Sequence, residues 1–190
     1  MTDFKYEKQF LDDYMNSLKF FKPVLYKKVY RTGILTNKIG KIFNIEDPEF
    51  YLAGFYANIS LQAMDNLLAK DFLSEIEREQ IKRHPILSSE YLKHKRLAKC
   101  AKYVYYHHEL PNGNGYYGID NYPKEACYIN IADVFEGSIT PKTYRPALTL
   151  EEALNITLSP YKDGLKISRE ELKEIEKILT SFYEEMLLMY

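Results

Sequence analysis

Cysteine, tryptophan and long apolar runs are scarce or missing in this sequence of 190 residues. The two cysteines, Cys100 and Cys127, exclude a disulfide framework and a Cys-x-x-Cys site, and they favour a reducing, cytoplasmic location. No apolar run approaches the roughly 20 residues that cross a bilayer, and the first residues do not form a signal peptide. The sequence therefore predicts a cytoplasmic protein without a membrane span.

An excess of charge of one sign is also missing. Lysine and arginine number 26, aspartate and glutamate 27, and the net charge is -1. This balance excludes strong non-specific binding of a nucleic-acid polymer, although it leaves room for a local basic patch. The hydrophobic content of 46% and the charged content of 28% are ordinary for a globular protein. The length suits a single domain over residues 1–190, with an N-terminal helix over 1–22 and a core over 23–190.

Apolar residues recur mostly at helical spacing, and strand signals hardly occur. The segment 24–43 predicts one helix, and Asp47 followed by Pro48 is typical of an N-cap with proline at the first helical position. Capping boxes, in which Ser or Thr precedes Glu by three residues, mark three further helix starts: Ser74 with Glu77, Thr149 with Glu152, and Ser168 with Glu171. The pattern predicts an all-α fold.

Histidine occurs 4 times, and three of the four are candidate metal ligands. An apolar stripe from Leu87 to Tyr105 predicts a long helix that ends at His107 and His108, and His84 lies before Pro85. Neutral imidazoles are common transition-metal ligands, so the three could share one ion. Alternatively, His107 and His108 only complement the carboxyl end of a helix. The fourth, His94, lies among lysines and arginine and is expected to be solvated.

Two other features adjoin these histidines in the sequence. Asp133 lies in an otherwise apolar helical stretch, where a carboxylate needs a metal, a histidine N–H or an arginine as partner. The segment 111–118 contains Gly113 and Gly115 beside Tyr116 and Tyr117, so it predicts a loop with backbone freedom and two large amphipathic side chains. Such tyrosines serve either as anchors for a partner or as packing against the domain itself.

These residues occur in the order and rough spacing of a known family. The matching segments are His84-Pro85, His107-His108-Glu109, Asn112-Gly113-Asn114-Gly115-Tyr116, Ala132-Asp133-Val134-Phe135, Tyr144-Arg145 and Leu150-Glu151-Glu152-Ala153. The chain resembles the HD-GYP domain, a branch of the HD-domain metal-dependent phosphohydrolases. The resemblance implies an HD-like helical bundle of about seven helices. It also implies a multinuclear metal centre that hydrolyses cyclic di-guanylate, a bacterial second messenger.

The chain departs from the family pattern at several positions. The His-Asp dyad is expected near Tyr56 and Ala57, which are neither, and Ser60 stands where the family has a phosphate-contacting lysine. The upstream ligand positions around residues 30–34 lack histidine and glutamate. The Gly-Tyr-Pro tripeptide reads Gly115-Tyr116-Tyr117. The resemblance therefore implies a degenerate member in which a binuclear centre is not expected.

What remains of the family's site defines the candidate residues. The resemblance implies one transition-metal ion (Fe, Mn, Zn or Ni) on His84, His107 and His108, with Asp133, Glu109 or water completing the shell. Phosphate contacts are expected from Arg145 and Lys142. Catalytic residues are not assigned.

Three hypotheses follow for function. The first is a binding or regulatory module that senses a cyclic dinucleotide or docks a diguanylate cyclase or another signalling protein through the loop with Gly113, Gly115, Tyr116 and Tyr117. The second is an active metal-dependent phosphodiesterase that acts on cyclic di-GMP or a related nucleotide. The third is a structural module for oligomerisation, such as a homodimer. Loss of the dyad favours the first hypothesis over the second, and retention of four ligand-type positions disfavours the third.

Overall fold

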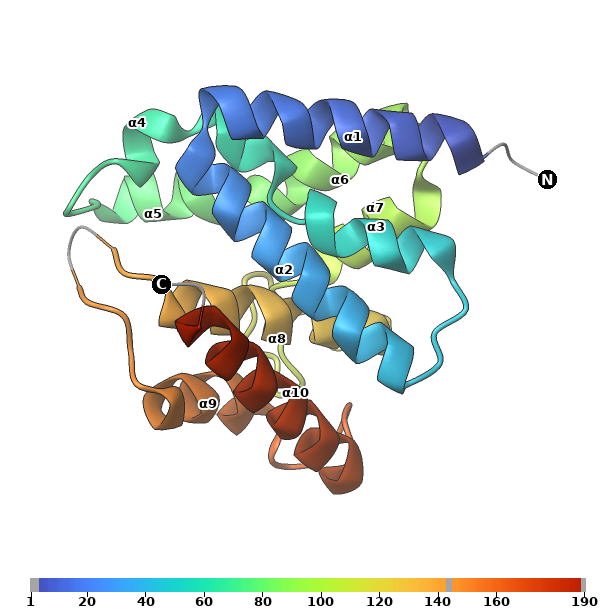
Figure 1. Ribbon diagram of the computed structural model, residues 1–190, viewed down its shortest axis with the longest axis vertical. Helices are drawn as coiled ribbons and strands as arrows, with labels where there is room; N and C mark the ends of the chain where they lie inside the picture. Colours follow the sequence, from blue (N-terminus) through green and yellow to red (C-terminus); the bar gives the residue numbers. More distant parts are fainter. Residues whose placement is uncertain (1–3, 143–144, 189–190) are drawn as a thin grey trace.

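The computed structural model describes residues 4–142 and 145–188, and over these ranges it contains helices and no strands. Helix α2 (Pro23–Ile42) crosses the middle of the molecule, with α1 (Phe4–Phe21) along one side and α8 (Lys124–Ile139) and α10 (Arg169–Leu187) on the other (Figure 1). The remaining elements are α3 (Pro48–Tyr56), η1 (Ile59–Ala63), α4 (Asp65–Leu68), α5 (Glu75–Lys82), α6 (His84–His94), α7 (Ala98–Tyr106), α9 (Leu150–Leu158) and η2 (Ser159–Tyr161). The predicted all-α bundle is confirmed.

The core forms where α2 packs against α3 and α8. Small residues allow this close approach, because a Cβ added at Gly33 on α2 would lie 2.3 Å from the Phe55 ring on α3. Leu35, Ile39 and Phe50 are fully buried between these helices. No described helix is long and apolar enough to cross a membrane.

Helix starts follow the local signals in the sequence. Asp47 caps α3 by accepting a hydrogen bond from the Glu49 N–H, with Pro48 at the first helical position. All three capping boxes are present with both of their hydrogen bonds, at Ser74, Thr149 and Ser168. Helix α1 ends at Phe21 and α2 begins at Pro23, next to the boundary expected at residue 22. The assignment of residues 1–190 to one domain stays a prediction.

The long helix expected to run into His107 is interrupted, and that prediction was wrong. Helix α6 ends at His94 and α7 begins at Ala98, with Arg96 between them in the left-handed region at φ 63. The interruption folds α6 and α7 side by side. As a result, the first residue of α6 and the last turn of α7 meet at the same end of the pair, which is where the candidate site lies.

Candidate metal centre

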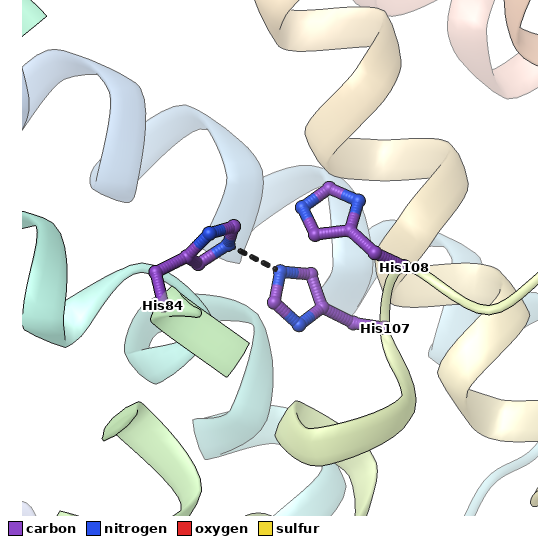
Figure 2. A group of neighbouring side chains, drawn as sticks. All are labelled: His84, His107 and His108. Carbon is purple, nitrogen blue, oxygen red and sulfur yellow. Dashed lines mark hydrogen bonds between the residues drawn. The ribbon is translucent and has the colours of Figure 1, made fainter. Parts of the chain in front are cut away.

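Three histidines converge at this meeting point of α6 and α7. His84 is the first residue of α6, His107 follows the last residue of α7, and His108 comes next in the chain. One ring nitrogen from each histidine lies within 4.8 Å of those of the other two, and the rings are turned toward a common point (Figure 2). His84 and His107 are buried, and His108 is partly covered. The expected convergence of these side chains is confirmed.

Backbone carbonyls fix the proton positions of two of these rings. Nδ1 of His84 lies 2.8 Å from the carbonyl oxygen of Ile81, and Nδ1 of His107 lies 2.6 Å from that of Val104. Because a carbonyl oxygen only accepts, each Nδ1 carries the proton and each Nε2 is left with a lone pair. The two Nε2 atoms face each other at 3.2 Å (Figure 2). Two lone pairs at this distance repel each other unless a cation lies beside them.

Protonation of one of these rings does not supply that cation near pH 7. Burial, followed by the neighbouring His107, lowers the pKa of His84 to about 3. Burial also lowers the pKa of His107, and burial together with the other two rings holds the pKa of His108 well below its ordinary value. All three rings are therefore neutral near pH 7, which is the form that binds metal.

A metal ion does fit the donor set. Two imidazole nitrogens bound to one ion at about 2.1 Å lie about 3.0 Å apart at a right angle and about 3.4 Å apart at the tetrahedral angle. The observed 3.2 Å between His84 and His107 falls between these values. Nδ1–H groups held by backbone carbonyls are also the usual outer support of metal-binding histidines. The arrangement suits a transition-metal ion on three neutral imidazoles.

Asp133 on α8 lies next to the histidines, but its negative charge is already compensated by a lysine. One oxygen, Oδ2, lies 3.8 Å from Nε2 of His108. The other, Oδ1, accepts from Nζ of Lys28 at 2.7 Å and from Nδ2 of Asn58 at 2.5 Å. Burial alone would raise the pKa of Asp133, but Lys28 and the histidines outweigh it and hold that pKa far below its ordinary value. The partner that the sequence required for Asp133 is thus a lysine and an amide.

Lys28 is a site residue that sequence reasoning missed. Its ammonium also lies 4.0 Å from Glu136, a fully buried carboxylate that accepts from the Thr140 hydroxyl at 2.7 Å and lies 3.7 Å from Arg31. Lys28 is on the inward face of α2, in the helical repeat of buried residues that includes Leu25, Thr32, Leu35 and Ile39. A lysine within such a buried stripe is the signal that could have identified it.

Comparison with known proteins shows the family of this chain. The family model described as HD domain matches residues 18–163. The chain belongs to the HD domain family. A solved structure with the same fold is that of Bd1817, a HDG"Y"P protein from Bdellovibrio bacteriovorus, with a TM-score of 0.63 and 18% sequence identity over 80% of this chain and 51% of that one. The chain thus spans about half the length of that protein. The comparison with curated proteins found no match.

In this HD domain, the turn that follows α3 contributes an amide to the site. Tyr56 and Ala57, where the resemblance placed the dyad, are fully buried in the core, and Tyr56 stacks on Phe10. Asn58, one position further on, is the residue that contacts Asp133. An amide thus stands beside the site, and the position of the dyad near Tyr56 and Ala57 stays a prediction. Ser60 donates to the carbonyl of His84 at 2.9 Å and so supports the start of α6.

The glycine loop of the HD domain closes over the histidines. Glu109 is buried and accepts from the N–H groups of Tyr117 at 3.0 Å and Ile119 at 2.8 Å, so both of its oxygens are engaged by the loop. The Tyr116 ring stacks on His108 with centroids 4.3 Å apart, and the Tyr117 hydroxyl donates to the carbonyl of Lys82. Both tyrosines therefore pack against the domain.

Two glycines permit this path of the loop. Gly113 has φ 70, and a Cβ added at Gly115 would lie 2.5 Å from the Cα of Glu109. Tyr116 remains 36% exposed, so part of the ring still faces outward. Docking of a signalling protein on this loop stays a prediction.

The two expected phosphate contacts lie at the end of α8 and pair through their backbones as an isolated bridge. The Arg145 guanidinium donates to the carbonyls of Gly137 at 2.7 Å, Ser138 at 3.2 Å and Pro146 at 2.9 Å, which fastens the chain after α8. Lys142 is partly buried, and burial followed by nearby Lys28 lowers its pKa. Their contact with phosphate stays a prediction.

Proposed function

We propose that this HD domain is a regulatory module that holds one transition-metal ion on His84, His107 and His108, binds a cyclic dinucleotide beside it, and turns that nucleotide over slowly or not at all. The observation that carries the proposal is the pair of Nε2 lone pairs facing each other at 3.2 Å while Asp133 is bound to Lys28. The three histidines can bind one ion as neutral ligands. A second ion would find the Asp133 carboxylate already engaged by Lys28.

The residues around the site support binding over turnover. A bound ion would supply Lewis acidity toward a phosphate oxygen, whereas phosphodiester hydrolysis by paired metals needs a second ion to stabilise the other oxygen. Asn58 contributes an amide N–H to Asp133, and an amide nitrogen does not bridge two ions. The Ile81 and Val104 carbonyls orient the rings, and Tyr116 covers His108 from solvent.

Positive charge near the site supports an anionic ligand. Burial, followed by the nearby Lys28 ammonium, lowers the pKa of Lys142, and both lysines interact with Asp133 and Glu136. No carboxylate among the described residues forms an ion pair with Lys142, so its ammonium is available to a phosphate. A cyclic dinucleotide has two phosphates and therefore suits a site where a metal and a lysine act together.

The proposed metal site predicts a specific loss on substitution. Purified wild-type protein incubated with Zn²⁺ and desalted is expected to retain about one ion per chain by elemental analysis. His107→Ala should retain less than about a tenth of that, because removal of a ligand leaves only two nitrogens on the ion. His94→Ala, at an exposed position on α6, is the matched control and should bind like the wild type. Equal zinc content in all three proteins would contradict the assignment.

The nucleotide-binding role predicts affinity without turnover. Calorimetric titration of the zinc-loaded protein with cyclic di-GMP should give saturable binding that weakens about tenfold or more in Lys142→Gln, because one charged phosphate contact is lost. Lys173→Gln, on the exposed face of α10, is the control. Multiple turnovers at about 1 s⁻¹ or faster, abolished in His107→Ala, would instead favour the active phosphodiesterase.

A further inference from the structure

Lys28 differs from the other ion-paired lysines in where its partner lies. Lys38, for example, pairs with Glu185 on the surface, where the two side chains are 37% and 46% exposed. Lys28 instead extends from α2 into the site and contacts Asp133, whose side chain is 8% exposed, and Glu136, which is 0% exposed. Its ammonium thus lies between two buried acidic groups of α8, one of which faces His108.

Asp133 links this ammonium to the three-histidine site. Its Oδ1 accepts from Lys28 at 2.7 Å, while its Oδ2 faces His108 at 3.8 Å. One oxygen of this carboxylate is therefore bound to the Lys28 ammonium, and the other faces the three-histidine site. A carboxylate in such a position is a bridging ligand when both of its neighbours are metal ions.

A stability role alone does not account for the pair. Replacing a buried ion pair with well-packed apolar side chains is often neutral or stabilising, so a lysine and an aspartate are not needed to fill this space. The charges do matter for a neighbouring ion, because an ammonium within several ångströms of a divalent cation repels it strongly in a buried site. The geometry therefore points to an effect on metal binding.

We infer that the Lys28 ammonium acts as a built-in cation that takes the place of a second metal ion beside the three-histidine site and restricts the centre to one ion. The inference rests on the proposed function, because it requires that the histidines bind metal. Lys28 occupies Oδ1 of Asp133 with a donor that has no lone pair to offer, and its positive charge disfavours a divalent ion in the same space. The cation is covalently tethered, so it does not exchange with solvent.

The test replaces the tethered cation with a ligand. Lys28→Glu would put a carboxylate close to Asp133, Glu136 and the Asn58 amide, an oxygen-rich set that suits Mn²⁺. After incubation with Mn²⁺ and desalting, the wild type is expected to retain about one ion per chain and Lys28→Glu about two. The electron paramagnetic resonance spectrum of the variant should show two coupled ions. Lys27→Glu makes the same change one residue away at an exposed position, and it should retain about one ion.

A second variant covers the risk that Lys28→Glu does not fold. Lys28→Gln removes the charge but keeps an N–H donor for Asp133. Its affinity for a single Mn²⁺ ion, measured by calorimetry, is expected to exceed that of the wild type at least about tenfold, because a like charge next to the ion is gone. Lys27→Gln should match the wild type.

The outcomes separate this inference from the proposal on which it rests. If the wild type binds one ion through His107, but Lys28→Glu also binds one and Lys28→Gln has wild-type affinity, the role of Lys28 is overturned and the histidine site stands. If the wild type binds no ion, the histidine site and the inference both fail. If Lys28→Glu does not fold, the affinity of Lys28→Gln alone decides the role of Lys28.

Discussion

The free energy of unfolding of the metal-free protein is expected to fall by as much as about 4 kcal/mol per pH unit as the pH drops from about 6.5 to about 4.5. The pKa of His84 is lowered to about 3, and those of His107 and His108 are also lowered, each mainly by burial. In the unfolded chain these rings titrate near the ordinary value of about 6.5.

The sign follows from which state takes up protons. Between the unfolded pKa and the lower folded pKa, the unfolded chain binds protons that the folded chain does not, so acid favours unfolding. A ring that stays neutral in the folded protein contributes about 1.4 kcal/mol per pH unit, so three such rings contribute at most about three times as much. The stabilisation is fully present above about pH 6.5 and is lost as the pH falls toward the folded values.

Urea denaturation at about pH 7, 6 and 5 measures this slope. His84→Asn removes the ring whose pKa is lowered to about 3 and should flatten the slope by about 1.4 kcal/mol per pH unit, whatever it does to stability at neutral pH. His94→Asn changes an exposed histidine and should retain the wild-type slope. A slope near zero in the wild type would show that the three rings are accessible to protons in the folded protein.

The fold was predictable wherever the signals are local. The capping boxes at Ser74, Thr149 and Ser168 and the Asp47 cap each depend on residues within one turn, and each is present in the structure. The break between α6 and α7 was missed, because the apolar stripe continues across it in phase and Arg96, which takes the left-handed conformation there, is not a turn-forming residue type.

The site was predictable only in part. The histidines could be identified from residue type and order, since few side chains bind transition metals so well. Lys28 contacts Asp133 across 105 residues of sequence. Local sequence patterns do not reveal a contact of that range, and the one local sign of it is a lysine within a stripe of buried residues. Asn58 was missed, because its contact with Asp133 spans 75 residues of sequence and the residues alone do not show how the chain turns toward the site after α3.

Among single substitutions, Lys28→Met is expected to lower the free energy of unfolding of the metal-free protein by about 3–5 kcal/mol. Methionine fills a similar volume but leaves the buried charges of Asp133 and Glu136 without the ammonium that lies 2.7 Å and 4.0 Å from them. Removal of one partner from a buried ion pair costs this much, because the other charge stays desolvated. Lys27→Met, at an exposed position, should change stability by no more than about 0.5 kcal/mol.

A double variant shows whether the loss comes from the orphaned charge. Lys28→Met combined with Asp133→Leu replaces both partners with apolar side chains, and it should recover most of the stability lost by Lys28→Met alone, with a coupling of about 2 kcal/mol or more in the double-mutant cycle. Asp133→Asn in the Lys28→Met background removes the charge with less change of shape and should recover part of it. If Lys28→Met costs less than about 1 kcal/mol in urea denaturation, then Asp133 is solvated without its lysine, and the pair is not the buried charge network that its distances and burial indicate.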